Sequence, residues 1–296
     1  MATLLSEFAQ TRGDEAALTD DLGSTTWAQL DERVNRLIHH LRAVGVQPGE
    51  RIALVSGNRR ETYEVVAACA HSGINVVPVN WHFAPDEVEY VVENSSSRLV
   101  ITEADYDHLA AASPVPRVVL GGSYEDALAA SSPHEPPEQS MGGVMFYTSG
   151  TTGRPKGVRS TAFHAGIPPK VYQLMAAGMV SMGLPAGGRT LLCGPHYHSA
   201  QWAFSFFPMI GGSSVFIQRR FVPEETLELI DRHAITNVHL VPTQFVRLLR
   251  VSEDRRRAFS GASLELVLHG AAPCSVEVKR QMMAWWGPKK IGRAHV

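Results

Sequence analysis

The sequence predicts an α/β protein in which mostly parallel strands are joined by crossover helices. Segments rich in Val, Ile and Leu alternate along the chain with segments whose apolar residues recur at helical spacing. This alternation favours parallel sheets, because parallel neighbours need a long crossover connection, usually a helix. With 296 residues, of which 44% are hydrophobic, the chain can also bury a large core.

The charge and the N-terminus exclude several classes of protein. The net charge of -2 and the 19% of charged residues indicate neither a nucleic-acid surface nor a disordered tail. Residues 1–8 lack the basic start and apolar run of a signal peptide, and no stretch approaches about 18 uninterrupted apolar residues. We therefore expect a cytoplasmic protein with no membrane span. The three cysteines are far apart, and we expect all three to be buried thiols.

The first half of the chain predicts one α/β layer. Thr26 and Gln29 fit a capping box, apolar residues follow at helical spacing between positions 30 and 41, and Gly45 closes this helix. The next expected elements are strand 51–55, helix 61–70, strand 74–79, helix 86–93, strand 98–102 and strand 118–120. Residues 130–138 are proline-rich and aperiodic, which is typical of a surface connector. We expect a first α/β subdomain and its connector over residues 1–139.

The second half predicts another α/β layer, which begins with the apolar segment 143–146. The expected elements are helix 170–182, strand 190–193, helix 202–210, strand 214–217, helix 223–233, strand 237–241, helix 243–250, strand 265–269 and helix 275–285. We expect a second, incomplete α/β subdomain over residues 140–290.

The loop over residues 147–157 has the composition of a phosphate-binding loop. Its glycines permit backbone turns that a Cβ would forbid, its hydroxyls donate hydrogen bonds, and its lysine supplies a positive charge. These residues are Thr148, Ser149, Gly150, Thr151, Thr152, Gly153, Lys156 and Gly157. The common P-loop pattern G-x-x-x-x-G-K-[ST] does not fit, because Lys156 follows a proline and Gly157 stands where the Ser or Thr should be.

Residues 147–158 resemble the signature loop of the adenylate-forming superfamily, and the likeness covers nearly the whole chain. Segments 26–37, 45–54 and 73–80 are similar to early segments of acyl-CoA synthetases, and the similarity continues to about residue 288. The resemblance implies the layered N-terminal domain of an adenylate-forming enzyme, with two mostly parallel sheets. It also implies ATP, Mg2+ and CoA as cofactor and co-substrates, and a small carboxylic acid as substrate.

The resemblance assigns roles in nucleotide binding to two segments. In the loop, it implies that Thr148, Ser149, Gly150, Thr151, Thr152, Gly153 and Lys156 bind the nucleotide. It further implies that Lys156 is catalytic and that Thr148 also helps to hold the metal. The second segment, 269–273, is similar to the small-residue segment that flanks adenine, which implies that Gly270, Ala271 and Ala272 line the nucleotide pocket. Taken alone, that segment is also compatible with a plain β–α turn.

The segment 195–202 carries the expected acyl site. Two histidines at i and i+2 are by themselves typical of a polar loop, and no third ligand indicates a metal. In acyl-CoA synthetases the matching segment is similar to Pro-Leu-Phe-His, which implies that His198 and Trp202 border the acyl pocket. Amino-acid-activating members carry an aspartate where this chain has His198. Because an imidazole cannot compensate an ammonium as a carboxylate does, a fatty or aryl acid is the expected substrate.

The similarity to the family stops near the end of the chain. The family continues with a strand and a Tyr-Gly-x-Thr-Glu motif, followed by a hinge and a C-terminal domain that carries a further lysine. The chain ends instead in Ile291-Gly-Arg-Ala-His-Val296, a sequence that a common short-read sequencing adapter also encodes. We therefore expect a truncated, inactive N-terminal fragment with a non-native tail over residues 291–296. The alternative is a non-catalytic nucleotide-binding or interaction protein that uses half of the fold.

Overall fold

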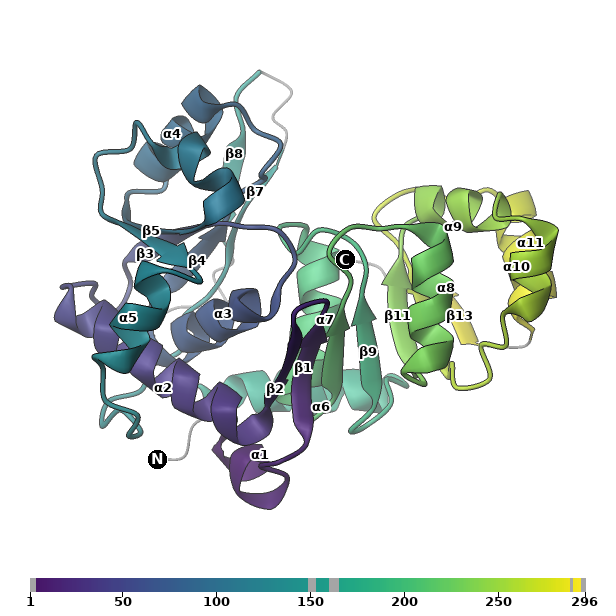
Figure 1. Ribbon diagram of the computed structural model, residues 1–296, viewed down its shortest axis with the longest axis horizontal. Helices are drawn as coiled ribbons and strands as arrows, with labels where there is room; N and C mark the ends of the chain where they lie inside the picture. The colour runs from purple at the N-terminus through teal and green to yellow at the C-terminus, as the bar shows by residue number, and fades with distance from the viewer. Residues whose placement is uncertain (1–3, 149–152, 160–164, 288–289, 294–296) are drawn as a thin grey trace. The chain divides into compact units, whose positions relative to one another are not determined.

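The computed structural model describes residues 4–148, 153–159, 165–287 and 290–293, which belong to two compact units. The first unit comprises Met1–Glu15 and Thr25–Tyr172. The second comprises Ala16–Ser24 and Gln173–Val296 (Figure 1). Residues 16–24 thus belong to the same unit as residues about 150 or more positions later in the chain. The boundary predicted after residue 139 and the non-native tail at 291–296 stay predictions.

The first unit is built on a parallel sheet with the strand order β4-β3-β5-β6. Its strands are β3 (Arg51–Val55), β4 (Asn75–Pro78), β5 (Ser97–Glu103) and β6 (Arg117–Leu120). Its helices are α1 (Ser6–Thr11), α2 (Trp27–Ala43), α3 (Arg60–Ser72), α4 (Pro85–Asn94), the 3-10 helix η1 (Ala104–Ala110) and α5 (Ser123–Ala129). Residues 130–138 form neither helix nor strand, as the connector predicts.

Helix α2 shows how closely local sequence determines an element. The Thr26 hydroxyl accepts a hydrogen bond from the Gln29 amide at 3.3 Å, and the Gln29 side chain accepts one from the Thr26 amide at 3.0 Å. This capping box satisfies two of the amides that every helix start leaves unpaired. Gly45 follows the helix with a φ of +87°, a conformation that glycine adopts without strain. The capping box and the closing glycine are both confirmed.

A buried charged cluster joins α2, α3 and α5. Arg33 on α2 donates to Glu64 on α3 at 2.7 Å and pairs with both carboxylate oxygens of Glu125 at 2.7 and 2.8 Å. The Tyr124 hydroxyl donates to the second oxygen of Glu64 at 2.9 Å. The Glu64 side chain is only 1% exposed, and burial raises its pKa despite the pairing with Arg33. The cluster satisfies each oxygen of this buried carboxylate.

Two further strands of the first unit, β7 (Met145–Thr148) and β8 (Lys156–Arg159), form an antiparallel hairpin. Val144, just before β7, pairs in parallel with Val76 of β4. The Tyr172 hydroxyl donates to the Gly142 carbonyl at 2.6 Å in the buried part of this unit. The base of the hairpin is therefore fixed to the edge of the main sheet.

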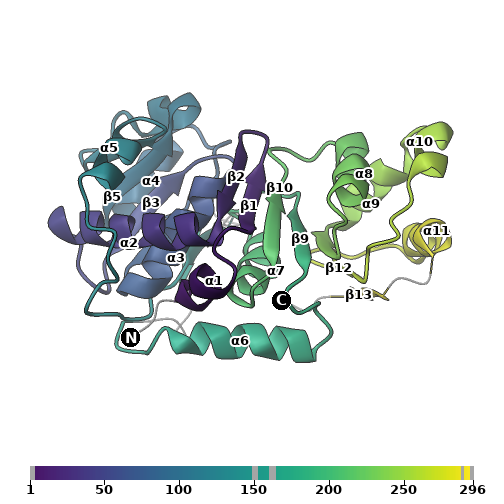
Figure 2. The same cartoon turned by 60° about the horizontal axis from the view of Figure 1, so that its bottom comes forward.

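The second unit contains a larger sheet with the strand order β13-β12-β11-β9-β10-β1-β2 (Figure 1). Its strands are β1 (Ala16–Asp20), β2 (Gly23–Thr26), β9 (Arg189–Leu192), β10 (Ser214–Ile217), β11 (Asn237–Leu240), β12 (Leu266–His269) and β13 (Lys290–Arg293). Neighbouring strands from β13 to β1 are parallel. Figure 2 shows β10 between β1 and β9. A segment near the N-terminus thus completes a sheet whose other strands lie far along the chain.

Helices cover both faces of this sheet. They are α6 (Lys170–Ser181), which begins at the boundary of the units, α7 (Ser199–Ile210), α8 (Pro223–Arg232), α9 (Pro242–Leu249), α10 (Glu253–Ala258) and α11 (Val276–Trp286). Helix α7 packs on β9, β10 and β11. The opposite face carries an apolar core to which α8, α9 and α11 contribute Ile230, Phe245 and Met282. The C-terminal edge of the sheet is therefore bordered by the loops that lead into these helices.

The predicted α/β class with two mostly parallel sheets is confirmed, and so are the helices and strands named above from the sequence, within a few residues at their ends. The elements that the sequence did not predict are α1, η1, α5, α10, β1, β2, β8 and β13. The expectation of three buried thiols is wrong for Cys274, which is only partly buried because it lies in the turn before α11. Among the described residues, no helix combines the length and the apolar character that a membrane crossing needs.

Candidate functional site

The described part of the phosphate loop is the hairpin of β7 and β8. Thr148 lies directly opposite Lys156, and Tyr147 lies opposite Gly157. Side chains directly opposite one another in an antiparallel pair have their Cβ atoms about 5 Å apart. Both Thr148 and Lys156 are exposed. The hairpin therefore places a hydroxyl and an ammonium together where the loop begins and ends. The predicted residues Ser149, Gly150, Thr151 and Thr152 lie outside the described residues.

Helix α4 holds this hairpin through two contacts. The Tyr147 hydroxyl donates to the Asn94 side-chain oxygen at 2.7 Å, and the Arg154 guanidinium lies 4.9 Å from the centre of the Tyr90 ring. Burial raises the pKa of Tyr147, so its phenol remains a hydrogen-bond donor at neutral pH. The loop is thus attached at its first strand and again just before its second.

Gly157 lies close to two side chains of β7. A Cβ at this position would lie 2.3 Å from the Met145 Cε and 3.0 Å from the Tyr147 ring. A larger residue would therefore require the end of the flexible Met145 side chain to move and the Tyr147 ring to shift slightly.

An open cavity of about 490 Å³ lies between α4 and the loop. Its lining residues are Ala84, Asp86, Glu87, Glu89, Tyr90, Glu93, Gly153, Arg154 and Pro155. This set contains four carboxylates and one arginine, so this side of the hairpin is acidic.

The second unit brings two of the predicted segments to one edge of its sheet. The segment with His198 and Trp202 follows β9, and the segment with Gly270 follows β12. Strands β9 and β12 flank β11, and all three are parallel. Ligands of α/β sheets bind at the carboxyl ends of parallel strands. The expected acyl and adenine segments thus lie at the edge where this fold class binds small molecules.

His198 and Trp202 differ in their surroundings. His198 is the N-cap of α7, and its ring lies 4.6 Å from that of Tyr197. Partial burial lowers the pKa of His198, so the ring is neutral at pH 7. Trp202 is buried, stacks on Phe206 at 5.3 Å and meets the edge of Phe207 at 5.3 Å. His198 can therefore reach a ligand, whereas Trp202 forms part of an aromatic core behind it.

The turn after β12 has an unusual backbone. Gly270 is buried, while Ala271 and Ala272 are exposed. Ala271 has a φ of +62°, a conformation that costs a non-glycine residue about 1–2 kcal/mol. Such strain is often stored at ligand-binding turns. Helix α11 then begins at Ser275, whose hydroxyl accepts a hydrogen bond from the Val278 amide at 3.2 Å.

Two residues at the same edge were missed in the sequence. Gln201 on α7 and His239 on β11 are both buried, and the Gln201 amide nitrogen lies 3.0 Å from His239 Nδ1. Burial, with His269 nearby, lowers the pKa of His239 to about 4. One signal was available, because a histidine between Val238 and Leu240 of a predicted strand is unexpected for a core position.

The described residues do not by themselves form a Mg2+ site. None of their His, Cys, Asp and Glu side chains gather in a group that could hold a metal ion. Mg2+ prefers several oxygen ligands in octahedral geometry, often with carboxylates, and the hairpin offers the single hydroxyl of Thr148 beside the Lys156 cation. The role of Thr148 as a metal ligand stays a prediction.

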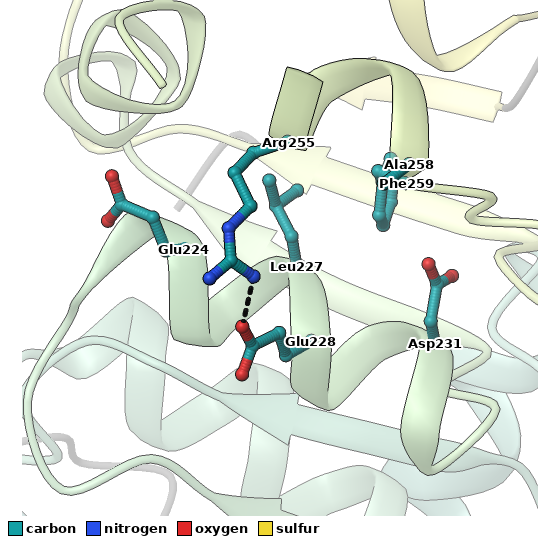
Figure 3. Close-up of a pocket in the computed structure, with 7 residues that line it drawn as sticks. All are labelled: Glu224, Leu227, Glu228, Asp231, Arg255, Ala258 and Phe259. Carbon is teal, nitrogen blue, oxygen red and sulfur yellow. Dashed lines mark hydrogen bonds and ion pairs between the residues drawn. The ribbon is translucent and has the colours of Figure 1, made fainter. Parts of the chain in front are cut away.

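A smaller cavity of about 80 Å³ lies between α8 and α10 (Figure 3). Arg255 points toward Glu228, with which it forms an ion pair at 2.6 Å. Asp231 accepts hydrogen bonds from the amides of Ser260 and Gly261 at 2.9 and 2.7 Å. These groups already have protein partners, so the cavity adds nothing to the candidate site.

The family assignment follows from a match over nearly the whole chain. Residues 5–294 match the family model described as AMP-binding enzyme. The chain belongs to the AMP-binding enzyme family. Among curated relatives, a feruloyl-CoA synthase of Amycolatopsis sp is 29% identical over 260 residues, and this alignment covers 86% of the chain and 50% of that protein. A fatty acid–[acyl-carrier-protein] ligase of Streptomyces coeruleorubidus is 30% identical over 271 residues, and this alignment covers 88% of the chain and 51% of that protein.

Solved structures share the fold. An anthranilate CoA ligase in complex with anthranoyl-AMP is similar with a TM-score of 0.86 at 22% identity, over 99% of the chain and 58% of that structure. The N-terminal domain of FACL13 from Mycobacterium tuberculosis is similar with a TM-score of 0.81 at 24% identity, over 95% of the chain and 72% of that structure. The chain thus has the fold of the N-terminal domains of adenylate-forming enzymes, and it spans about half the length of the curated relatives that it matches.

Proposed function

We propose that Lys156 in the hairpin of β7 and β8, together with the segments of His198 and Gly270, supplies part of the active site of an acid–CoA ligase. The parent reaction joins a carboxylic acid and ATP to acyl-AMP and pyrophosphate, and then transfers the acyl group to CoA. The observation that carries this proposal is the common sheet edge of β9 and β12, which holds the segments of His198 and Gly270. The curated relatives that are CoA ligases support it.

In this proposal, the hairpin of β7 and β8 stabilises the reacting phosphate groups by electrostatics. Displacement at the α-phosphate builds negative charge on the leaving pyrophosphate. Lys156 offsets that charge, and the hydroxyl of Thr148, directly across the hairpin, donates a hydrogen bond. Because this charge grows toward the transition state, the lysine accelerates the reaction more than it tightens substrate binding.

The substrate is an acid without an α-ammonium group. His198 is neutral at pH 7 and cannot form the ion pair that an amino-acid substrate requires. The aromatic side chains of α7, which include Trp202 and Phe206, form an apolar core behind it. We therefore propose a fatty or aryl acid, with ATP, Mg2+ and CoA as co-substrates, in a cytoplasmic enzyme.

The 296-residue chain by itself does not form acyl-adenylates in this proposal. It spans about half the length of its curated relatives, so the residues that correspond to their second halves do not contribute to its site. Catalysis by preorganised charges is lost when donors on one side are missing and water fills the site. The competing function is that of a non-catalytic nucleotide-binding or interaction protein that uses half of the fold.

Exchange of labelled pyrophosphate into ATP tests both statements. We would express two proteins. One is the protein that the cloned genomic locus encodes, called the locus protein below, and the other is residues 1–296. Both would be assayed with a panel of fatty and aryl acids. We expect acid-dependent exchange and acyl-CoA formation by the locus protein. The absence of exchange with every acid would favour the non-catalytic function. Exchange by residues 1–296 above a Lys156→Ala control would show that the chain alone is sufficient.

A further inference from the structure

The side-chain orientation of Gln201 on α7 is fixed by its neighbours. The Gly194 amide donates to Gln201 Oε1 at 3.2 Å, so the oxygen of the side-chain amide faces Gly194. The nitrogen of that amide then faces His239, with its ring Nδ1 at 3.0 Å and its carbonyl oxygen at 3.3 Å. The reverse orientation would set the Gly194 N–H against an NH2 group and is excluded, because two donors cannot pair.

This orientation determines the tautomer of His239. Both hydrogens of the Gln201 amide are donated, one to the His239 carbonyl and one to His239 Nδ1. Nδ1 is therefore an acceptor without a proton. Because burial lowers the pKa of His239 to about 4, the ring is neutral at pH 7 and its single proton is on Nε2.

The Nε2–H group of His239 is buried without an acceptor. The residue is 2% exposed, and Nε2 has no hydrogen-bond partner among the described residues. The ring is also held in place, since it stacks on Phe204 with centroids 5.0 Å apart and 7° between the planes. A buried donor without a partner is destabilising, and native proteins seldom leave one unless something else satisfies it.

The position of this group indicates what could satisfy it. His239 is the third residue of β11, close to the carboxyl end of the strand and between β9 and β12. Gln201 and Phe204 tie it to α7, the helix that begins at His198 and contains Trp202. The ring of His239 is thus tied to α7 on the acyl side of the proposed site, and His269, just before Gly270, also lies near it.

We propose that His239 Nε2–H donates a hydrogen bond to an oxygen on the tail of the acid substrate. The substrate class is then a carboxylic acid whose tail carries a carbonyl, hydroxyl or ether oxygen, rather than a plain alkyl or phenyl acid. Gln201 and Gly194 are positioning residues that set the tautomer. This inference rests on the acid–CoA ligase function proposed above and adds the polarity of the acid.

A second buried histidine provides a matched control. His71 near the end of α3 is fully buried, accepts a hydrogen bond from the Leu4 amide at Nε2 over 2.6 Å, and has no hydrogen-bond partner at Nδ1 among the described residues. It shares the burial and the unpaired nitrogen of His239 but belongs to the first unit and does not end a strand. Its replacement should leave acid selectivity unchanged.

The test is a calorimetric titration of the protein that the cloned genomic locus encodes with non-hydrolysable acyl-sulfamoyl adenosines. Each apolar analogue is paired with keto or methoxy analogues that carry one oxygen at successive positions of the tail. In the wild type we expect at least one oxygen-bearing analogue to bind about tenfold more tightly than its apolar partner. His239→Phe keeps an aromatic ring without the donor and should abolish this ratio. His239→Gln keeps a donor and should retain part of it, and His71→Phe should retain it fully.

The outcomes separate this inference from the function on which it rests. If the apolar analogues bind and no oxygen-bearing analogue is preferred, or if His239→Phe keeps the preference, the inference is wrong while the ligase function stands. If no analogue binds, the ligase function fails and the inference with it. The tautomer is checked independently by nitrogen-15 NMR of labelled histidine, in which a proton on Nδ1 of His239 would overturn the argument.

Discussion

Two polar networks, one in each unit, differ in how completely their buried groups are paired. In the first unit, Arg33, Glu64 and Tyr124 form a charged cluster in which each oxygen of the buried carboxylate has a donor. In the second, Gln201 and His239 form a neutral network that ends in a buried donor without an acceptor. The charged cluster joins three helices, whereas the neutral network lies near the carboxyl ends of the strands of a sheet. A complete network indicates a structural role, and an incomplete one at a strand end indicates a ligand.

The largest expected effect comes from breaking the charged cluster. Arg33→Met leaves the buried Glu64 without its cation and should destabilise the chain by about 3–5 kcal/mol. The measurement is urea unfolding followed by circular dichroism. The matched control is Arg280→Met, which breaks an exposed ion pair with Glu277 at 3.3 Å and should cost under about 1 kcal/mol. Equal losses in the two variants would show that the cluster is not a structural centre.

The next largest effect tests whether Lys156 of the first unit takes part in catalysis. In the locus protein, Lys156→Ala should slow pyrophosphate exchange about 100- to 1000-fold, or about 3 kcal/mol of barrier, with little change in the KM for the acid. Lys170→Ala, at an exposed lysine that begins α6, is the control and should leave the rate unchanged. An unchanged rate in Lys156→Ala would remove this lysine from the mechanism.

A third prediction disturbs the neutral network without touching its histidine. A Cβ on Gly194 would lie 2.5 Å from Gln201 Cδ, so Gly194→Ala should displace Gln201 and cost about 1–3 kcal/mol of stability. It should also reduce the preference for oxygen-bearing analogues. Gly178→Ala is the control, because a Cβ there meets nothing within 4 Å and alanine favours the helix. A Gly194→Ala variant with wild-type stability and selectivity would show that Gln201 does not set the tautomer.

The smallest effect is a dependence of stability on pH. The pKa of His239 is lowered to about 4 in the folded chain, against about 6.5 when unfolded. Between these values the unfolded chain binds one more proton, so stability falls as the pH is lowered, by about 1.4 kcal/mol per pH unit for this residue. His71 and His196, with pKa values lowered to about 3 by burial, act in the same direction. Urea unfolding at several pH values should give a shallower slope for His239→Phe, and an unchanged slope would mean that the folded histidine is already charged.

Much of the fold was predictable because its determinants are local. The capping box at Thr26 and the glycine at position 45 each lie within two residues of an end of α2. Strands β3 and β5 contain the short apolar runs 52–55 and 99–101, which lie between helical patterns. Strand β1 was missed because its pairing with β10 joins Leu18 to Val215, a partner that no local pattern indicates.

The candidate site was predictable only where a motif carried it. The resemblance named Lys156, His198 and Gly270, and the described structure gives their places in the hairpin and at the sheet edge. Gln201 and His239 were missed because their relation is a hydrogen bond between residues 38 positions apart. The sequence shows a histidine within a predicted strand. Only the arrangement of hydrogen-bond donors and acceptors shows that one nitrogen of its ring lacks a partner.

The most direct measurement is the identity of the first product. The locus protein would be incubated with ATP, Mg2+ and the preferred acid but without CoA, and the bound nucleotide analysed by mass spectrometry. The account predicts acyl-AMP with release of pyrophosphate, and none in the Lys156→Ala variant. Formation of ADP and an acyl phosphate, or ATP bound unchanged with every acid, would contradict the proposal that these residues belong to an adenylate-forming site.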